Sequence, residues 1–215
     1  PIKSSAASDV YKRQLTVNTF GGGKKFISGN RCEKPLGLGK ERQLPDLYRF
    51  KLEQIRTLSE DCAKRAAAHT GKRGVIGLPL GLNMYENLFF WEAFFRNLDF
   101  DIVVSDLSSR ALYAKGQYSV PSDTACYPAK LVHGHVKWLV DRGVKWIFYP
   151  SINYERIEDP TAPNHYNCPI VATYPEVIAG NMDDIFEEND VIFSHPFLPY
   201  DDDEALVCLL YTSPS

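Results

Sequence analysis

Gly74-Val-Ile-Gly-Leu78 begins the part of the chain that decides the fold. This short apolar run is followed by an aromatic-rich segment with helical spacing, Tyr85 to Leu98, and then by a second apolar run, Phe100-Asp-Ile-Val-Val104. Short apolar strands that alternate with helices are typical of a parallel sheet covered on both faces, because each crossover helix buries one face of the sheet. The stretch therefore predicts an α/β fold.

The same alternation continues toward the C-terminus. Helices are expected at Ser108–Lys115, at Pro128–Arg142 and from Tyr174 to Ala179, with Gly143 closing the second of them. The predicted strands of one mainly parallel sheet are Val75–Leu78, Ile102–Val104, Trp146–Tyr149, Ile170–Ala172 and Val191–Phe193. Residues 74–206 are therefore predicted to form a doubly wound, Rossmann-like α/β domain.

A smaller module is expected before this domain, in residues 15–73. Leu15–Phe20 and Phe26–Ser28 flank the glycine turn Gly21–Gly23, a pattern that predicts a β-hairpin. Asp46 is positioned to cap a helix that begins near Leu47. The apolar face predicted for that helix is Leu47, Phe50, Leu52, Ile55 and Leu58.

Both ends of the chain look foreign to this pattern. Residues 1–14 and 207–215 resemble translated sequencing-adapter tails that flank metagenomic fragments, and neither continues the periodicity beside it. We therefore set both aside as adapter-derived tails and expect them to make few contacts with the rest of the chain. A chain flanked in this way is expected to be an internal piece of a longer protein.

Composition indicates a soluble globular protein and excludes several partners. The 215 residues are 44% hydrophobic and 24% charged, with a formal net charge of −3. This mild acidity argues against nucleic acid, and no apolar run approaches the roughly 20 residues of a membrane span. Five irregularly spaced cysteines indicate reduced thiols and a cytoplasmic location. The sequence carries neither a Gly-x-Gly-x-x-Gly fingerprint nor a Walker A loop.

The most chemically suggestive run is Val120-Pro-Ser-Asp-Thr-Ala-Cys-Tyr-Pro-Ala-Lys-Leu-Val-His-Gly-His135. It places Cys126 at the start of a predicted helix, where the helix dipole favours the thiolate that attacks electrophiles and binds metals. The alternative is a cysteine that packs as a small hydrophobe. His133 and His135 lie two residues apart and so point to different faces of the helix, which prevents them from chelating one ion. One of them is expected to reach the site and the other to be packed or exposed to solvent.

Four stretches together resemble one family. They are Thr19-Phe-Gly-Gly-Gly-Lys-Lys-Phe-Ile-Ser-Gly-Asn-Arg-Cys-Glu33, Leu82-Asn-Met-Tyr-Glu86, Ser122–His135, and Asn164-His-Tyr-Asn-Cys-Pro-Ile-Val-Ala-Thr-Tyr-Pro-Glu176. They resemble the DUF2229 region of acyl-CoA dehydratase activase-related proteins, large relatives of the 2-hydroxyglutaryl-CoA dehydratase system of anaerobic metabolism. The resemblance covers about residues 15–206.

The resemblance implies a cofactor. Dehydratase subunits of similar design hold a four-iron–four-sulfur cluster through cysteines, and Cys126 matches the first of these. Ser151 stands near the place where a second cysteine is usual, and serine oxygen is a poorer ligand for such a cluster than thiolate. Cys168 is a substitute ligand, although a strand at Ile170–Ala172 would put it at the amino end of the sheet, far from Cys126. Cys32 resembles the last member of a cysteine module whose earlier members precede the hairpin.

Two functions remain open at this point. The first is a dehydratase-like domain that binds an iron–sulfur cluster or an acyl-CoA around Cys126, with ATPase activase domains of the same or a partner chain as partners. The second is a non-catalytic docking module that links those ATPase domains to a partner dehydratase. The candidate binding residues at the predicted strand ends are Cys126, Tyr127, Tyr149, Ser151, His165 and Asn83, and Cys126 is expected to be the most reactive thiol.

Overall fold

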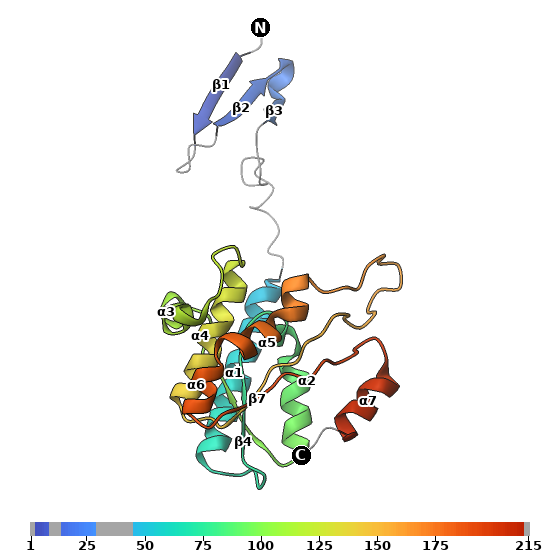
Figure 1. The fold of residues 1–215 in the computed structure, drawn as a ribbon. Helices are drawn as coiled ribbons and strands as arrows, with labels where there is room; N and C mark the ends of the chain where they lie inside the picture. Colours follow the sequence, from blue (N-terminus) through green and yellow to red (C-terminus); the bar gives the residue numbers. More distant parts are fainter. Residues whose placement is uncertain (1–2, 9–13, 29–44, 213–215) are drawn as a thin grey trace. The chain divides into compact units, whose positions relative to one another are not determined.

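The computed structural model describes residues 3–8, 14–28 and 45–212 (Figure 1). The chain forms two compact units, Pro1–Lys51 and Leu52–Ser215. The division lies before the predicted boundary at Gly74, because Ile55 and Cys62 are buried in the hydrophobic core of the second unit. Cys32 lies outside the described residues.

The first unit contains a three-stranded antiparallel sheet of β1 (Lys3–Ser8), β2 (Gln14–Thr19) and β3 (Lys25–Ser28). The predicted hairpin is confirmed, since β2 pairs with β3 across the short 3-10 helix η1 (Gly21–Gly23). Gly22 and Gly23 have φ values of 80° and 78°, which favour glycine. The expectation that residues 1–14 make few contacts is wrong, because β1 pairs with β2 over its whole length.

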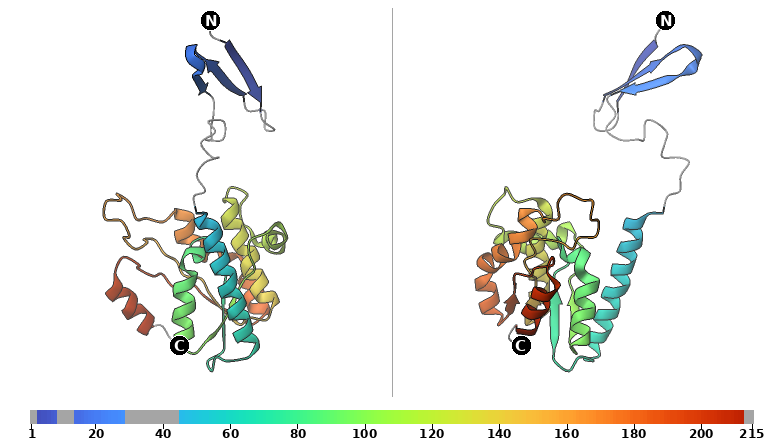
Figure 2. Two further views of the ribbon diagram at one scale, coloured as in Figure 1. Left: turned by 180° about the vertical axis from the view of Figure 1, so that it is seen from behind. Right: turned by 90° about the vertical axis from the view of Figure 1, so that its right-hand side faces the viewer.

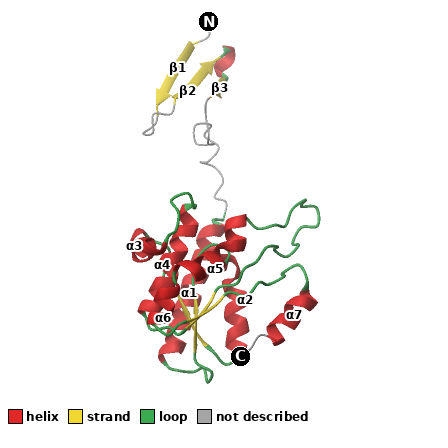
Figure 3. Cartoon of the chain, in the orientation of Figure 1, coloured by secondary structure: helices red, strands yellow, loops and turns green. Residues whose placement is uncertain are grey.

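The second unit is built on a four-stranded sheet in which every neighbouring pair is parallel (Figure 3). Its order is β5-β4-β6-β7, which confirms the predicted α/β fold with a parallel sheet. Four of the five predicted strands belong to it. Their bounds are β4 (Val75–Leu78), β5 (Asp101–Val104), β6 (Trp146–Phe148) and β7 (Ile192–Ser194).

Helices cover both faces of this sheet (Figure 2). One face carries α1 (Leu47–Ala67), from Leu52 on, and α2 (Met84–Asn97). The other face carries α4 (Tyr127–Asp141), α5 (Pro169–Asn181) and α6 (Asp183–Glu188), with α3 (Arg110–Gly116) and η3 (Gln117–Ser119) packed on α4. The chain ends in α7 (Asp203–Thr212). This helix continues through residues 207–212, which we had set aside.

The predicted strand at Ile170–Ala172 is wrong, because these residues form the first turn of α5. Pro169 follows the N-cap residue Cys168, and proline is favoured at the first helical position, where its fixed φ suits the helix and its missing N–H costs nothing. Tyr174 and Ile178, four residues apart, then bury one face of the helix. The β-branched Ile170-Val171 pair suggested a strand, and the proline before it and the helical spacing after it outweigh that local preference.

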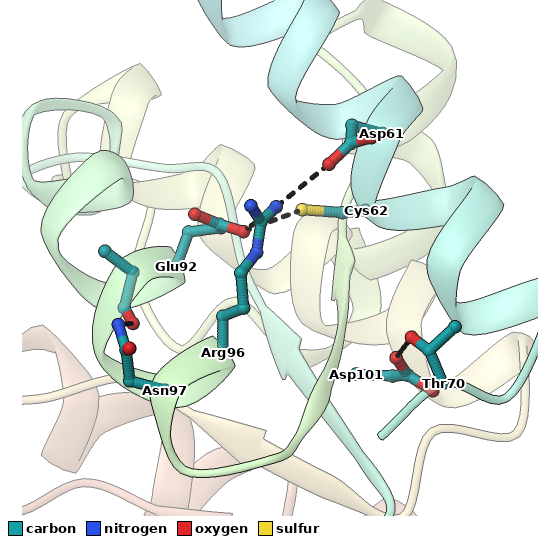
Figure 4. A network of polar contacts seen from close by, with 8 residues as sticks. Asp61, Cys62, Thr70, Glu92, Arg96, Asn97 and Asp101 are labelled. Carbon is teal, nitrogen blue, oxygen red and sulfur yellow. Dashed lines mark hydrogen bonds and ion pairs between the residues drawn. The ribbon is translucent and has the colours of Figure 1, made fainter.

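The helix α1 buries only the later part of its predicted apolar face. Leu47 and Phe50 are 70% and 60% exposed, so the predicted apolar face is wrong at its N-terminal end, while Ile55 is fully buried. Further along, Cys62 packs against α2 beside the ion pairs that Arg96 makes with Asp61 and Glu92 (Figure 4). This network joins α1 to α2 across one face of the sheet.

Candidate functional site

The order of the strands places a topological switch point between the two central strands, β4 and β6. The chain passes from β4 to β5 on one side and then returns to place β6 on the other side of β4. Crossovers in opposite directions leave a gap at the carboxyl ends of the two central strands, and ligands of such sheets bind there. The loops at this point are Pro79–Asn83, which follows β4, and Tyr149–Ile152, which follows β6.

Two exposed cysteines, Cys126 and Cys168, occupy equivalent positions at the start of their helices. Cys126 is the N-cap residue of α4 and Cys168 is the N-cap residue of α5, and a proline stands within the first two residues of each helix. The two helices pack on the same face of the sheet, and their N-terminal ends lie at the same end of the molecule (Figures 1 and 2). The expectation that Cys168 enters at the amino end of the sheet is therefore corrected, because it rested on the strand that is now α5.

The other candidates beside Cys126 differ in accessibility. Tyr127 is half exposed and its ring centroid lies 5.4 Å from that of Tyr113 on α3. Tyr149 is fully buried, and burial together with the nearby Tyr174 raises the pKa of its hydroxyl. Ser151 is 4% exposed. Neither the Tyr149 hydroxyl nor the Ser151 Oγ has a hydrogen-bond partner among the residues that the structure describes.

Both histidines of α4 are fully buried, so of the two alternatives left open by the sequence, packed or exposed to solvent, the structure shows packing. Gly134 separates them, and a Cβ atom at Gly134 would lie 2.2 Å from the carbonyl oxygen of Leu112 on α3. A Cβ atom at Gly116 would in turn lie 2.2 Å from the carbonyl carbon of His133. The two glycines thus bring the backbones of α3 and α4 into direct contact, and α3 covers the side of α4 that solvent would otherwise reach.

His135 joins the loops that follow β4 and β5. Its Nδ1 lies 2.8 Å from Ser105 Oγ, which also accepts a hydrogen bond from Leu80 N–H, and its Nε2 lies 3.0 Å from Ser108 Oγ. Because the Ser105 hydroxyl finds no other acceptor among the described residues, it donates to Nδ1. The proton of His135 is therefore on Nε2 and is donated to Ser108.

His133 carries its proton on the other nitrogen. Ser119 Oγ donates to the Gly116 carbonyl, so it accepts the 2.7 Å hydrogen bond from Nδ1 of His133. The free Nε2 then accepts from the Tyr174 hydroxyl at 3.1 Å. Burial lowers the pKa of His133 and of His135 to about 4, and nearby Asp106 partly offsets this effect at His135. Both rings are therefore neutral at pH 7, with every ring nitrogen in a hydrogen bond.

Tyr174 of α5 completes this network. The side chain is 2% exposed, and burial raises the pKa of its hydroxyl to about 12, with a smaller contribution from Cys126. The sequence did not single out Tyr174, and the only available signal was its position six residues after Cys168 in the resembling stretch.

Asn83 and His165 lie elsewhere, in an open cleft of about 790 Å³. The cleft is bounded by α2, by the segment from Glu155 to Asn167, and by the beginning of α7. It does not include Cys126, Tyr127, Tyr149, Ser151 or Cys168. The predicted site residues therefore form two separate sets. The first, which we call the thiol group, contains Cys126 and Cys168 at the N-terminal ends of α4 and α5, and the second contains Asn83 and His165 in the cleft.

Sequence reasoning missed most of the cleft. Most of its charged residues lie in the irregular segment after β6, while Glu86, Asn87 and Phe90 lie on α2. Its remaining charged residue, Asp203, begins α7. Asn87 is four residues after Asn83 and so lies on the same face of α2, which is a signal that helical periodicity could have provided. Asp203 and Leu206 of α7 also line the cleft, and no local pattern in the sequence indicates that this helix lies near α2.

The remaining cysteines are less suited to ligand binding. Cys62 is 2% exposed, and burial, with a smaller contribution from Glu92, raises the pKa of its thiol to about 12. Cys208 is exposed on α7. In the parts of the chain that the structure describes, no three side chains of His, Cys, Asp or Glu are grouped so that they could hold a metal ion. Cys126 and Cys168 thus provide an incomplete ligand set.

Comparison with known proteins identifies one family. The family model described as CoA enzyme activase uncharacterised domain (DUF2229) matches residues 75–213, which include the whole parallel sheet and α7. The match therefore extends past the predicted end of the native sequence at residue 206. No curated protein and no solved structure matches the chain. Within the described residues, no helix is both long enough and apolar enough to span a bilayer.

Proposed function

Because the chain belongs to the family of the CoA enzyme activase uncharacterised domain (DUF2229), and is therefore related to acyl-CoA activase proteins, we propose that its α/β unit is a dehydratase-like domain that binds an iron–sulfur cluster. Cys126 and Cys168 would supply two of the thiolate ligands. The observation that carries the proposal is that both thiols are exposed at the N-caps of adjacent helices.

The chemistry of these positions suits anionic sulfur. The first N–H groups of a helix have no partner within the helix, and the helix dipole places partial positive charge there. Thiolates, which helix N-termini favour in general, are the preferred ligands of iron–sulfur clusters. The described residues fit part of such a site, because they supply two exposed thiols but no group of three metal ligands.

The cluster would supply one-electron transfer when bound. Under this proposal the chain orients the ligands through α4 and α5, and the hydrogen bond between His133 and Tyr174 holds these two helices together. The partners would be ATPase activase domains of the same or another chain, in a system that acts on a 2-hydroxyacyl-CoA.

Anaerobic reconstitution with iron and sulfide tests the proposal. Wild-type protein should turn brown and absorb near about 400 nm, where charge transfer from cysteine to iron occurs. Cys126→Ser and Cys168→Ser should each lose most of this absorbance, because serine replaces a soft ligand with a hard one. Cys208→Ser is the matched control, since Cys208 is also exposed but lies on α7.

Each result separates the two functions considered for this chain. A wild-type protein that stays colourless rejects the cluster and favours the docking module. Absorbance that survives in Cys168→Ser removes Cys168 from the ligand set. Alkylation of the metal-free protein gives an independent check, because exposed Cys126 should react faster than buried Cys62, whose thiol has a raised pKa.

A further inference from the structure

The cleft beside α2 is separate from the thiol group and has its own chemistry. Its wall contains five carboxylates, those of Glu86, Glu155, Glu158, Asp159 and Asp203, and a single arginine, Arg156. Arg156 donates to both carboxylate oxygens of Asp203 at 2.6 Å, so the positive charge of Arg156 is neutralised by Asp203 and does not offset the other carboxylates. The potential in the cleft is therefore negative. It attracts cations and opposes the phosphates of a CoA molecule.

Two amides that line the same cleft, one on a buried residue and one on a half-buried residue, each have a buried atom without a hydrogen-bond partner among the described residues. Asn83 is 8% exposed, and its Oδ1 has no hydrogen-bond partner among the described residues. The same is true of Nδ2 of Asn87, one helical turn later. Buried polar atoms of this kind are normally paired, because leaving one unpaired costs its desolvation energy. Asn83 also makes no side-chain hydrogen bond as the N-cap residue of α2, so helix capping does not explain its burial.

An acceptor and a donor one helical turn apart distinguish between kinds of cation. An inorganic ion or an alkylamine offers nothing for the amide N–H of Asn87 to donate to. An extended polypeptide offers both a backbone N–H for Asn83 and a backbone carbonyl for Asn87. The exposed rings of Phe90 and Tyr166 in the same cleft provide faces for the side chains of lysine or arginine.

We propose that this cleft binds a short basic segment of a partner polypeptide, with its backbone held by Asn83 and Asn87 and its cationic side chains held by the surrounding carboxylates. The proposal does not depend on the cluster, because none of the cysteines considered as ligands lines the cleft. It gives the domain a surface that recognises another protein.

The test measures the fluorescence anisotropy of a labelled peptide of alternating glycine and lysine at about 50 mM salt, where charge attraction acts over a long range. Wild-type protein should bind it, and a glutamate version of the peptide should not bind. Asn83→Ala and Asn87→Ala should each weaken binding about fivefold, the usual effect of one lost hydrogen bond. Circular dichroism of each variant shows whether it folds.

A charge-matched pair of variants separates the cleft from the net charge of the protein. Glu158→Gln with Asp159→Asn should weaken binding about tenfold, because both carboxylates lie in the cleft. Asp184→Asn with Glu188→Gln makes the same change in net charge on α6 and should leave binding unchanged. Equal effects of the two pairs would overturn the proposal.

Three further results would also overturn it. The first is absence of peptide binding to wild-type protein. The second is peptide binding to Asn83→Ala and Asn87→Ala that is as tight as binding to wild type, which would leave only charge attraction. The third is binding of spermidine that depends on Asn83 without any binding of the peptide, which would make the ligand a small amine. Failure of iron reconstitution leaves this outcome unaffected, so the two proposals are tested separately.

Discussion

The histidines of α4 and the asparagines of α2 differ in whether their buried polar atoms have hydrogen-bond partners. On the α4 side, four ring nitrogens of two buried histidines all have partners, and two glycines bring the helix backbones into contact. On the α2 side, Asn83 and Asn87 leave amide atoms buried without partners in the described residues. A network in which every buried polar atom is paired stabilises the fold. Buried polar atoms without partners are instead available to pair with a ligand.

The largest expected effect comes from breaking the backbone contact between α3 and α4. Gly134→Ala should lower the free energy of unfolding by about 3 kcal/mol or more, because the new Cβ would clash with the Leu112 carbonyl, and rigid backbone yields poorly. Urea denaturation followed by circular dichroism measures the change. Gly180→Ala is the control, since no atom lies within 4 Å of its added Cβ in α5, and it should be neutral or stabilising.

The free energy of unfolding should fall in acid because His133 and His135 are buried in their neutral form. Their pKa is about 4 in the folded protein and 6.5 in the unfolded reference, so above pH 6.5 both states are neutral and the histidines give no pH dependence. Between pH 6.5 and about 4 only the unfolded chain takes up protons, so stability falls as the pH falls. The loss should be roughly 1–3 kcal/mol for each histidine.

A comparison of variants isolates this contribution from that of the carboxylates. Urea midpoints measured across this pH range should fall less steeply in a His133→Gln, His135→Gln double variant than in wild type. His69 is exposed in the described structure, and His69→Asn should keep the wild-type slope. Equal slopes in the double variant and wild type would mean that the histidines are already protonated in the folded protein.

A smaller effect is expected from removing one hydroxyl of the completed network. Ser105→Ala should cost about 1–3 kcal/mol, because Leu80 N–H and His135 Nδ1 would lose a buried partner. Thermal unfolding measures it, and Ser122→Ala, at an exposed turn, is the control. A change within the error of the control would show that water replaces the hydroxyl.

The smallest effect is expected from Asn83, whose buried amide oxygen has no partner among the described residues. Asn83→Ala should change the free energy of unfolding by no more than about 0.5 kcal/mol, because its Oδ1 has no hydrogen bond to lose and its side chain does not cap α2. The same denaturation experiment measures it. A loss as large as that of Ser105→Ala would show that Asn83 contributes to stability as much as a fully hydrogen-bonded side chain does.

The sequence predicted the parallel sheet well, because each of its strands is a short apolar run bounded by glycine, proline or polar residues. It failed at Ile170–Ala172, where the β-branched residues outweighed the signal of Pro169. It also failed at the N-terminal end of α1, where Leu47 and Phe50 have helical spacing but remain exposed. Periodicity shows that a helix has an apolar stripe, but it does not show which turns of the helix meet the core.

For the candidate site, the sequence located Cys126 correctly at a helix N-cap but separated it from Cys168 through the wrong strand. The burial of His133 and His135 depends on α3 reaching α4 through Gly116 and Gly134, glycines 18 residues apart. The cleft depends on α2 meeting a segment some 70 residues later. Contacts at such separations are set by the tertiary fold and leave no local pattern.

The backbone contact between α3 and α4 has a mechanical consequence. A helix of seven residues such as α3 is too short to persist alone, so its hydrogen bonds depend on the helix beneath it. The interlocked backbones leave no room for α3 to slide along α4, and the two helices with η3 should open to solvent as one body. Hydrogen exchange in α3 should therefore be as slow as in α4. Any motion of α4 that repositions the thiol of Cys126 would therefore move α3 and η3 with it.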